Sequence, residues 1–242
     1  MTEQLQLDFE KILKTSDISQ NEVDTKRSYL KKFIESGFPN RKQENWKFLD
    51  ISQIIKKNIG DLSFFNDYSI PNKIDPSIFV DGLEHNKIIF INGRIEKIDF
   101  NYEDQNKIQI SDEIEKITTF DNVNSLIDLN NAFTNKVFKI LIKKNYSLNK
   151  PLIIYHSTDE KMKSRNINLR LDFELEENSS LRLIDFFQDS SDKNFANILY
   201  NFDLKKDSIL KNYKIDKFRN DNLKYSFNNI EQEANSISET FI

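Results

Sequence analysis

The strongest pattern in the chain is a regular alternation of apolar and polar residues that begins after Phe133. A short alternating run covers 138–142, and longer runs cover 167–175 and 198–204. From 167 to 175 every second residue is Ile, Leu or Phe, and the residues between them are Asn, Arg, Asp and Glu. Because successive side chains of a strand point to opposite faces, this period of two predicts β-strands that bury one face.

These predicted strands also repeat as a unit. Phe173-Glu174-Leu175, a polar corner and Leu181 recur 29 positions later as Phe202-Asp203-Leu204, another polar corner and Leu210. Short strands that recur at a period in the high twenties, with polar corners, are typical of a solenoid. A sandwich of two antiparallel layers would give a similar alternation, so the periodicity alone leaves both folds open.

The first 60 residues and the stretch from Asp121 to Phe133 have helical spacing instead. A helix is predicted over Asn21–Ser36, stopped by Gly37 and Pro39. Its apolar face holds Val23, Leu30, Phe33 and Ile34. Asp50-Ile51-Ser52-Gln53 has the spacing of a capping box and predicts a second, short helix that ends near Gly60.

The single Trp of the chain, Trp46, lies between these two helices in a charged, turn-prone segment. Burying an indole removes a large apolar area from water, so Trp46 is expected to anchor the helical region to the rest of the fold. Arg41 and Glu44 are expected to form a local ion pair beside it.

Residues 61–87 are predicted to be irregular, because Pro71 and Pro76 break regular structure. A β-hairpin is predicted from Lys87 to Asp99: the apolar run 88–91 is followed by Asn92-Gly93, a turn pair that suits the twist of antiparallel strands.

Composition narrows the class of protein. The chain has 242 residues, of which 38% are hydrophobic and 31% charged, and a net charge of −4. No basic excess is available for binding nucleic acid. The longest apolar runs are too short to span a membrane, and the stretch from Met1 to Lys14 contains no continuous apolar segment of the kind that secretory signals have. A cytoplasmic protein is therefore expected, without nucleic-acid or membrane partners.

The residue types for several chemistries are missing or scattered. No Cys is present, which excludes disulfides, thiolate nucleophiles and Cys-ligated clusters in this chain. His85 and His156 are far apart in the sequence, without the close pairing of a local metal site; His156 is expected in a strand and His85 in a loop. Four scattered Gly cannot form a phosphate-binding loop, and Asn and Asp are expected to make the turns that Gly would otherwise make.

Clusters of acidic residues suggest one alternative. Some β-helix enzymes act on carbohydrates with paired carboxylates, so a polysaccharide lyase or hydrolase is a rival interpretation. Glu176 and Glu177, however, fall in a predicted corner, where solvated charges are expected in any case. The clusters are Glu174/Glu176/Glu177, Asp189/Asp192 and Glu231/Glu233.

Five segments, in this order, resemble the SufB/SufD family of scaffold subunits for iron–sulfur cluster assembly, and its SufD members in particular. The resemblance covers the chain from about Asp24 onward. Two positions depart from the family: Asn135-Lys136 stands where Asp-Gly is usual, and Asp185 where Glu is usual. The segments are Pro39–Phe48 with Arg41, Glu44, Trp46, Lys47 and Phe48; Phe90–Ile95; Leu129–Phe133; Lys150–His156; and Ser180–Asp185.

The resemblance implies a right-handed parallel β-helix preceded by a helical region. Residues 1–134 would form that region, with the hairpin near 88–98, and residues 135–242 the first coils of the β-helix. Family members continue through further coils and a C-terminal helical part, so a chain truncated at its C-terminal end is expected; Phe241 and Ile242 look like the opening of another strand.

For function, the resemblance implies a non-enzymatic scaffold in a complex with a SufB-like subunit and a SufC-like ATPase. The cluster would form at the complex, and the ATPase partner would use the ATP. This chain itself is expected to bind no cofactor. No catalytic, cofactor-binding or metal-ligating residue can be assigned in it, because the family's functional positions lie in the later coils.

Overall fold

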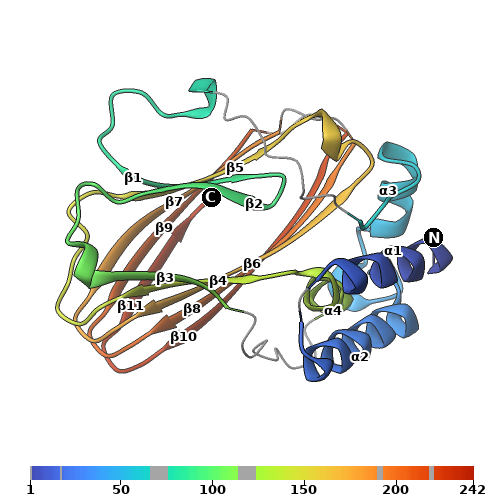
Figure 1. Cartoon of the computed structure of the whole chain (residues 1–242), viewed down its shortest axis with the longest axis horizontal. Coiled ribbons are helices and arrows are strands. Elements are labelled where there is room, and N and C mark those ends of the chain that lie inside the picture. The colour runs from blue at the N-terminus through green and yellow to red at the C-terminus, as the bar shows by residue number, and fades with distance from the viewer. Residues whose placement is uncertain (1, 17, 66–75, 114–123, 190–192, 218–220) are drawn as a thin grey trace.

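A computed structural model describes the chain except for residues 1, 17, 66–75, 114–123, 190–192 and 218–220. Helices gather at one end, and two long, twisted sheets form the rest of the molecule (Figure 1). The helices described are α1 (Thr2–Thr15), α2 (Gln20–Ser36), α3 (Ile51–Asn58) and α4 (Ser125–Phe133). None of these is both long and apolar enough to cross a membrane.

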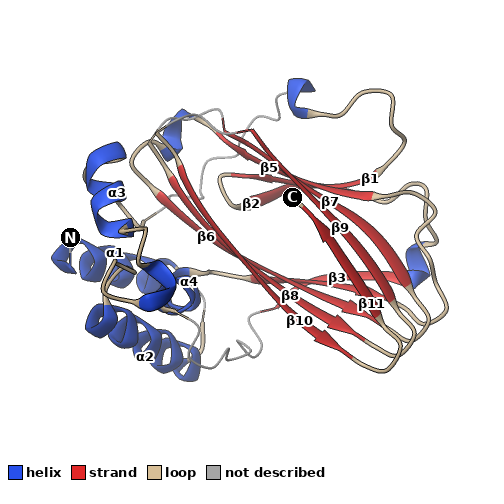
Figure 2. Cartoon of the chain, turned by 180° about the vertical axis from the view of Figure 1, so that it is seen from behind, coloured by secondary structure: helices blue, strands red, loops and turns tan. Residues whose placement is uncertain are grey.

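The strands divide between two sheets as the chain coils. The first sheet has the order β11-β9-β7-β5-β1-β2 and the second β10-β8-β6-β4-β3, so that successive strands from β4 onward alternate between them (Figure 2). The bounds are β1 (Asn86–Ile91), β2 (Arg94–Asp99), β3 (Ile108–Glu113), β4 (Val137–Ile142), β5 (Leu152–Thr158), β6 (Asn166–Leu175), β7 (Ser180–Asp189), β8 (Phe195–Leu204), β9 (Ile209–Lys217), β10 (Leu223–Gln232) and β11 (Ile237–Phe241).

Parallel pairing identifies the fold as a β-solenoid of about three turns. From β4 onward every neighbouring pair in the two sheets is parallel. Antiparallel pairing among the described strands is confined to β1–β2 and β3–β4. The solenoid prediction is confirmed, and the two-layer antiparallel sandwich is excluded.

The sequence repeat of 29 positions corresponds to one turn of the solenoid. Phe173 pairs with Phe202 across β6 and β8, and Leu181 pairs with Leu210 across β7 and β9. The rings of Phe173 and Phe202 stack at 5.0 Å between centroids. Each turn therefore buries its apolar face against the same positions of the next, inside the space between the two sheets. That core includes Ile140, Ile154, Leu169, Leu171, Leu183, Ile198 and Leu204.

Asparagine and aspartate make one column of corners, as predicted. Asn145, Asn178, Asp207 and Asn235 all have φ between 57° and 60°, the left-handed conformation that these residues tolerate better than most. Their side chains join successive turns: Asn178 Nδ2 donates to Asn145 Oδ1 at 2.9 Å, and Asn235 Nδ2 donates to Asp207 Oδ1 at 3.0 Å.

Asn178→Ala should destabilise the fold by about 1–2 kcal/mol, because Ala is strained at positive φ and loses the bond to Asn145. Asn178→Gly removes the same side chain without the strain and should cost less. The free energies of unfolding of both variants in urea check this expectation. Equal losses for Ala and Gly would contradict the role given to the backbone conformation.

The hairpin prediction is confirmed, but its strands also belong to the solenoid. β1 and β2 pair antiparallel around Asn92 and Gly93, and β1 also pairs in parallel with β5. The sequence analysis did not predict β3, which pairs antiparallel with β4. Both sheets therefore include strands from residues 1–134, the range expected to form the helical region, as well as strands from residues 135–242.

The helical predictions are largely confirmed. α2 and α3 lie where expected, and Asp50 Oδ1 caps α3 by accepting from Gln53 N at 3.0 Å. α2 has its own capping box, Ser19 with Glu22, which the sequence analysis overlooked. The buried stripe of α2 differs from the predicted one, since it includes Lys26 and Tyr29 as well as Leu30 and Phe33. Ser125 begins α4, and the earlier part of its predicted range, 121–123, lies outside the described residues.

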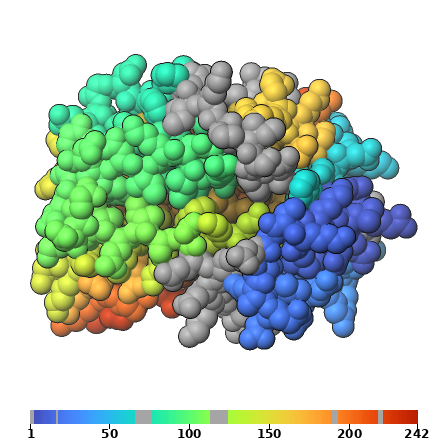
Figure 3. Space-filling model, in the orientation of Figure 1, coloured from blue at the N-terminus to red at the C-terminus, as the bar shows by residue number. Residues whose placement is uncertain are grey.

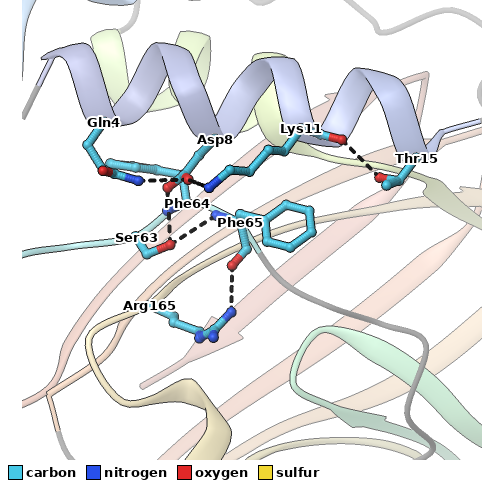
Figure 4. A network of polar contacts seen from close by, with 8 residues as sticks. All are labelled: Gln4, Asp8, Lys11, Thr15, Ser63, Phe64, Phe65 and Arg165. Carbon is cyan, nitrogen blue, oxygen red and sulfur yellow. Dashed lines mark hydrogen bonds and ion pairs between the residues drawn. The ribbon is translucent and has the colours of Figure 1, made fainter.

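Hydrogen bonds from buried polar side chains attach the helices to the solenoid. Asp8 of α1 is buried and accepts from Ser63 Oγ at 3.1 Å and from Phe64 N at 2.9 Å (Figure 4). The segment carrying Ser63 lies beside β6, because Asn166 N donates to Ser63 O at 2.8 Å. Asn130 of α4 donates through Nδ2 to the carbonyl oxygens of Leu169 and Asn197 at 3.1 and 2.7 Å.

Lys26 is a buried cation at the carboxyl end of α4. Its ammonium group donates to the carbonyl oxygens of Ala132 and Thr134, the groups that a helix leaves unpaired at this end. Burial lowers the pKa of Lys26 to about 8, against a smaller raising effect of Glu22. The ammonium therefore caps the Leu129–Phe133 segment from a neighbouring helix.

Trp46 is only half-buried, which corrects part of the expectation for its segment. The indole packs at the edge of the helical core and lies 6.1 Å, centroid to centroid, from the Tyr225 ring of β10. It thus joins the helical region to the solenoid as predicted. No ion pair joins Arg41 and Glu44 in the described structure, because both side chains point to solvent. Phe48, also in the segment, is 81% exposed.

Candidate functional site

A cluster of charged and polar side chains fills the space between the two sheets near β9 and β10. We call it the lumen cluster. The inward positions of β5, β7 and β8 are mostly apolar, whereas those of β9 and β10 are mostly polar, so the cluster lies where the apolar core ends. Its members are His156 of β5, Asp185 of β7, Tyr200 of β8, Lys214 and Asp216 of β9, and Lys224 of β10.

His156 stands at the centre of the cluster. Its ring is stacked between those of Phe90 and Phe187, with centroid distances of 5.3 and 5.9 Å. Its Nε2 atom lies 3.1 Å from Asp185 Oδ1 and 3.1 Å from the hydroxyl oxygen of Tyr200. Stacking thus fixes the imidazole plane, and its edge faces one carboxylate and one phenol.

Asp185 is fully buried, and its negative charge balances the positive charges of Lys214 and Lys224. Besides His156, it faces Lys224, whose Nζ lies 4.0 Å from Oδ2. Neither carboxylate oxygen has a hydrogen bond of good geometry among the described residues, so its partners hold it by charge. Burial alone would raise the pKa of Asp185, but His156, Lys224 and Lys214 outweigh it and lower the pKa below its ordinary range.

The two lysines connect the sheets. Lys214 of β9 donates to Ser226 Oγ at 2.7 Å and to Asn228 Oδ1 at 2.9 Å, both on β10, and its Nζ lies 4.7 Å from the Tyr200 ring centroid. Lys224 donates to Asp216 Oδ1 at 2.6 Å. Burial lowers the pKa of Lys214, and Asp185 partly offsets that effect.

Tyr200 closes the cluster from the second sheet. Burial raises the pKa of its phenol well above the ordinary value, and the negative charge of Asp185 raises it further. The phenol therefore stays protonated and offers a donor to this interior. The two carboxylates of the cluster, Asp185 and Asp216, and its two ammonium groups, Lys214 and Lys224, carry opposite charges that balance one another.

Sequence analysis did not predict the lumen cluster, although one signal was present. In β7 the inward positions are Leu181, Leu183, Asp185 and Phe187, so a carboxylate occupies a place where the alternation requires an apolar residue. The resemblance had marked Asp185 only as a departure from the usual Glu. A charged residue at a predicted inward position needs a partner from another strand, and only the fold identifies that partner.

None of the acidic residues singled out in the sequence belongs to the lumen cluster: Glu176, Glu177 and Glu233 lie at corners, and Glu174, Asp189 and Glu231 lie on β6, β7 and β10. Glu174 pairs with Lys139 at 2.7 Å, and Glu177 pairs with Lys144 at 2.5 Å. Glu176 accepts from Lys144 N at 2.7 Å. Glu233 pairs with Lys205 at 3.3 Å, and Asp192 lies outside the described residues.

The two histidines lie as predicted, His156 in β5 and His85 in the loop before β1. Nε2 of His85 is 2.9 Å from the hydroxyl of Tyr155, and Nδ1 is 2.6 Å from Leu83 O. Among the described residues, no three or more His, Cys, Asp or Glu side chains gather in a way that could hold a metal.

A cavity of about 750 Å³ lies between β2 and β3, on the face shown in Figure 3. Phe100, Ile108 and Ile110 form its apolar part, and Lys97, Asp99 and Gln105 are among its polar lining residues. Glu103 lines it too, but four donors saturate the carboxylate: Asn86 Nδ2, Tyr146 OH, and the backbone N–H groups of Asn149 and Lys150. These bonds make Glu103 a structural residue.

Neither the protein-family models nor the curated proteins that were searched contain a match to this chain.

Proposed function

We propose that the chain is a non-enzymatic scaffold subunit of a SufBCD-type complex for cytoplasmic iron–sulfur cluster assembly. In this role it would pair with a SufB-like subunit and a SufC-like ATPase. The ATPase would hydrolyse ATP, and the cluster would form at the complex, so this chain itself would bind no cofactor.

The observation that carries the proposal is the place of the five resembling segments in the fold. Each lies at a junction or in a strand of the solenoid. The segment with Trp46 joins the helices to β10 through Tyr225, and the Leu129–Phe133 segment ends α4 where Asn130 and Lys26 attach it. Phe90–Ile95 forms the β1–β2 turn, and the other two segments begin β5 and β7.

The carbohydrate-acting alternative is less well supported by the site geometry. An acid and a base for glycoside cleavage must flank an open substrate groove. Glu174 is instead paired with Lys139 across β4 and β6, and Lys144 engages Glu176 and Glu177 at a corner. Asp185 is enclosed between the sheets. These carboxylates therefore have structural partners that explain their positions.

Affinity purification of the full chain from its own cells tests the proposal. With a tag at the N-terminus, we expect a SufB-like and a SufC-like protein to copurify in fixed proportion and to remain with the chain through size exclusion. A strain carrying the same tag on an unrelated protein is the control. Purification of the chain without these two proteins, or cleavage of acidic polysaccharides by the purified chain, would contradict the scaffold role.

A further inference from the structure

The outer face of the first sheet carries an apolar stripe that is only half covered. We define the stripe by two columns of outward side chains that follow the strand pairing. One column is Ile153, Ile184, Tyr213 and Phe241, and the other is Ile89, Tyr155, Phe186 and Ile215. The first column runs from β5 to β11 and the second from β1 to β9, each without a polar interruption.

Over β1, β5 and β7, a short segment of the chain itself covers the stripe; it begins with a 3-10 turn, Pro76–Ile78. Ile78 of this segment is buried against Ile89, Ile153 and Tyr155 in a separate hydrophobic cluster. The Phe79 ring meets the Tyr155 ring edge to face at 5.2 Å, and Val80 N donates to the Tyr155 hydroxyl at 3.1 Å. A short Ile-Phe-Val sequence that follows a 3-10 turn therefore fits this surface.

Over β9 and β11 the same stripe is exposed. Tyr213 is 37% exposed, Ile215 43% and Phe241 49%, and the rings of Tyr213 and Phe241 stack at 4.9 Å to form a flat platform. These side chains point outward from the sheet, so stacking of another turn on the edge of β11 would leave their face open. The covered and exposed parts share one surface and one pattern of side chains.

Positive charge borders the exposed part. On one side of the stripe, Arg182 of β7 and Lys211 of β9 occupy neighbouring positions in the strand register. On the other side lies Lys217, whose Nζ is 5.1 Å from the Phe186 ring centroid. Glu239 offsets Lys211 at 3.2 Å. In the covering segment, the acidic residues Asp81 and Glu84 come after the apolar residues 78–80. Glu84 forms an ion pair with Lys150 at 2.6 Å.

We propose that the exposed part of the stripe, centred on Tyr213 and Ile215, is a docking surface for a short peptide segment of a partner protein. That segment carries two or three aliphatic or aromatic residues followed by carboxylates. The segment would cover β9 and β11 as residues 76–84 cover β1, β5 and β7. Its carboxylates would lie near the cations Arg182, Lys211 and Lys217. The proposal does not rest on a role in cluster assembly, because it uses only the shape and charge of this face.

A fluorescent peptide with the sequence of residues 76–84 is the probe, titrated with the full chain and followed by anisotropy. We expect saturable binding that Tyr213→Ser combined with Ile215→Ser weakens by about tenfold or more, since two apolar contacts are lost. Ile98→Ser on β2 is the matched control: Ile98 is 44% exposed but lies outside the stripe, so this variant should bind as the wild type does. Tyr213, Ile215 and Ile98 are all exposed, so the substitutions should leave the fold intact. An unchanged circular dichroism spectrum of each variant verifies this.

Three results would overturn the proposal. The first is no saturable binding of the probe, and the second is equal binding by the double variant, which would place the peptide elsewhere. The third is self-association of the chain in sedimentation experiments that the double variant abolishes, because the occupant would then be a second copy. Weaker binding at high salt, or by a peptide with Asn and Gln in place of its two acids, supports the charge complementarity.

Discussion

Asp185→Asn should lower the free energy of unfolding by about 3 kcal/mol or more at neutral pH, because it removes the negative charge from a buried ion cluster. His156, Lys224 and Lys214 would then face one another in the interior without the carboxylate that balances them. The side chain keeps nearly the same shape, so the loss reports charge and not packing. Urea unfolding followed by the fluorescence of Trp46, the single tryptophan, gives the measurement.

The loss should also depend on pH, with a defined sign. The pKa of Asp185 is lower in the folded state than its ordinary value of 3.8, so the folded protein holds the ionised form more tightly than the unfolded chain does. The stabilisation by Asp185 is therefore complete above the unfolded pKa and is lost as the pH falls through the folded pKa. The gap between wild type and variant should narrow in acid. A gap that stays constant down to pH 3 would contradict the charge argument.

Asp216→Asn is the matched control for this experiment. Asp216 contacts Lys224 at 2.6 Å, closer than Asp185 does, but its side chain is 32% exposed. Solvent screens that pair, and Lys224 keeps Asp185 as a partner, so the cost should stay below about 1 kcal/mol. If Asp216→Asn costs as much as Asp185→Asn, burial is not what gives the lumen cluster its effect.

Asn130→Ala should cost about 2–4 kcal/mol, since it leaves buried backbone groups of two strands without their donor. The Asn130 amide donates to Leu169 O on β6 and Asn197 O on β8, and its Oδ1 accepts from Thr134 Oγ1 at 2.8 Å. Without these bonds α4 should separate from the sheet more readily. Amide hydrogen exchange in α4 should therefore accelerate more than exchange in the strands between the sheets.

Asn131→Ala on the same helix is the comparison for Asn130. Asn131 is just as buried, but among the described residues its Nδ2 has no hydrogen-bond partner, and its Oδ1 lies at a long distance of 3.5 Å from Arg170 Nη1. Its removal should cost clearly less than the removal of Asn130. Similar losses for the two variants would mean that side-chain volume, and not the bonds to β6 and β8, attaches the helix.

These two sites show why the solenoid needs specific polar contacts. Each turn repeats nearly the same apolar positions, so hydrophobic burial alone does not fix which inward residues face each other or where the helices attach. The lumen cluster joins strands of both sheets, and Asn130 attaches α4 to two successive turns. Specific polar pairs fix the register because a shift by one position would leave buried groups unsatisfied.

The local patterns in the sequence predicted the strands and the corners, and the family resemblance favoured a solenoid over a sandwich. The alternation from Phe133 onward predicted the strands, and the 29-residue repeat is typical of a solenoid. The structure then places Phe173 over Phe202, because a solenoid stacks equivalent positions. The positive-φ corners followed from the shortage of Gly, which leaves Asn and Asp as the next most tolerant residues. These features depend on neighbours in sequence or on a simple repeat, so the chain by itself was sufficient.

The tertiary structure alone decided which polar residues meet. Asp185, Tyr200 and Lys224 lie on three different strands, and Lys26 and Thr134 are more than 100 positions apart. β3 lacked a strong alternation, and its place comes from pairing with β4. Trp46 stayed half exposed because Tyr225 and the helical core leave part of the indole open to solvent. Such contacts join segments that are distant in the sequence, and the local pattern of apolar and polar residues does not predict them.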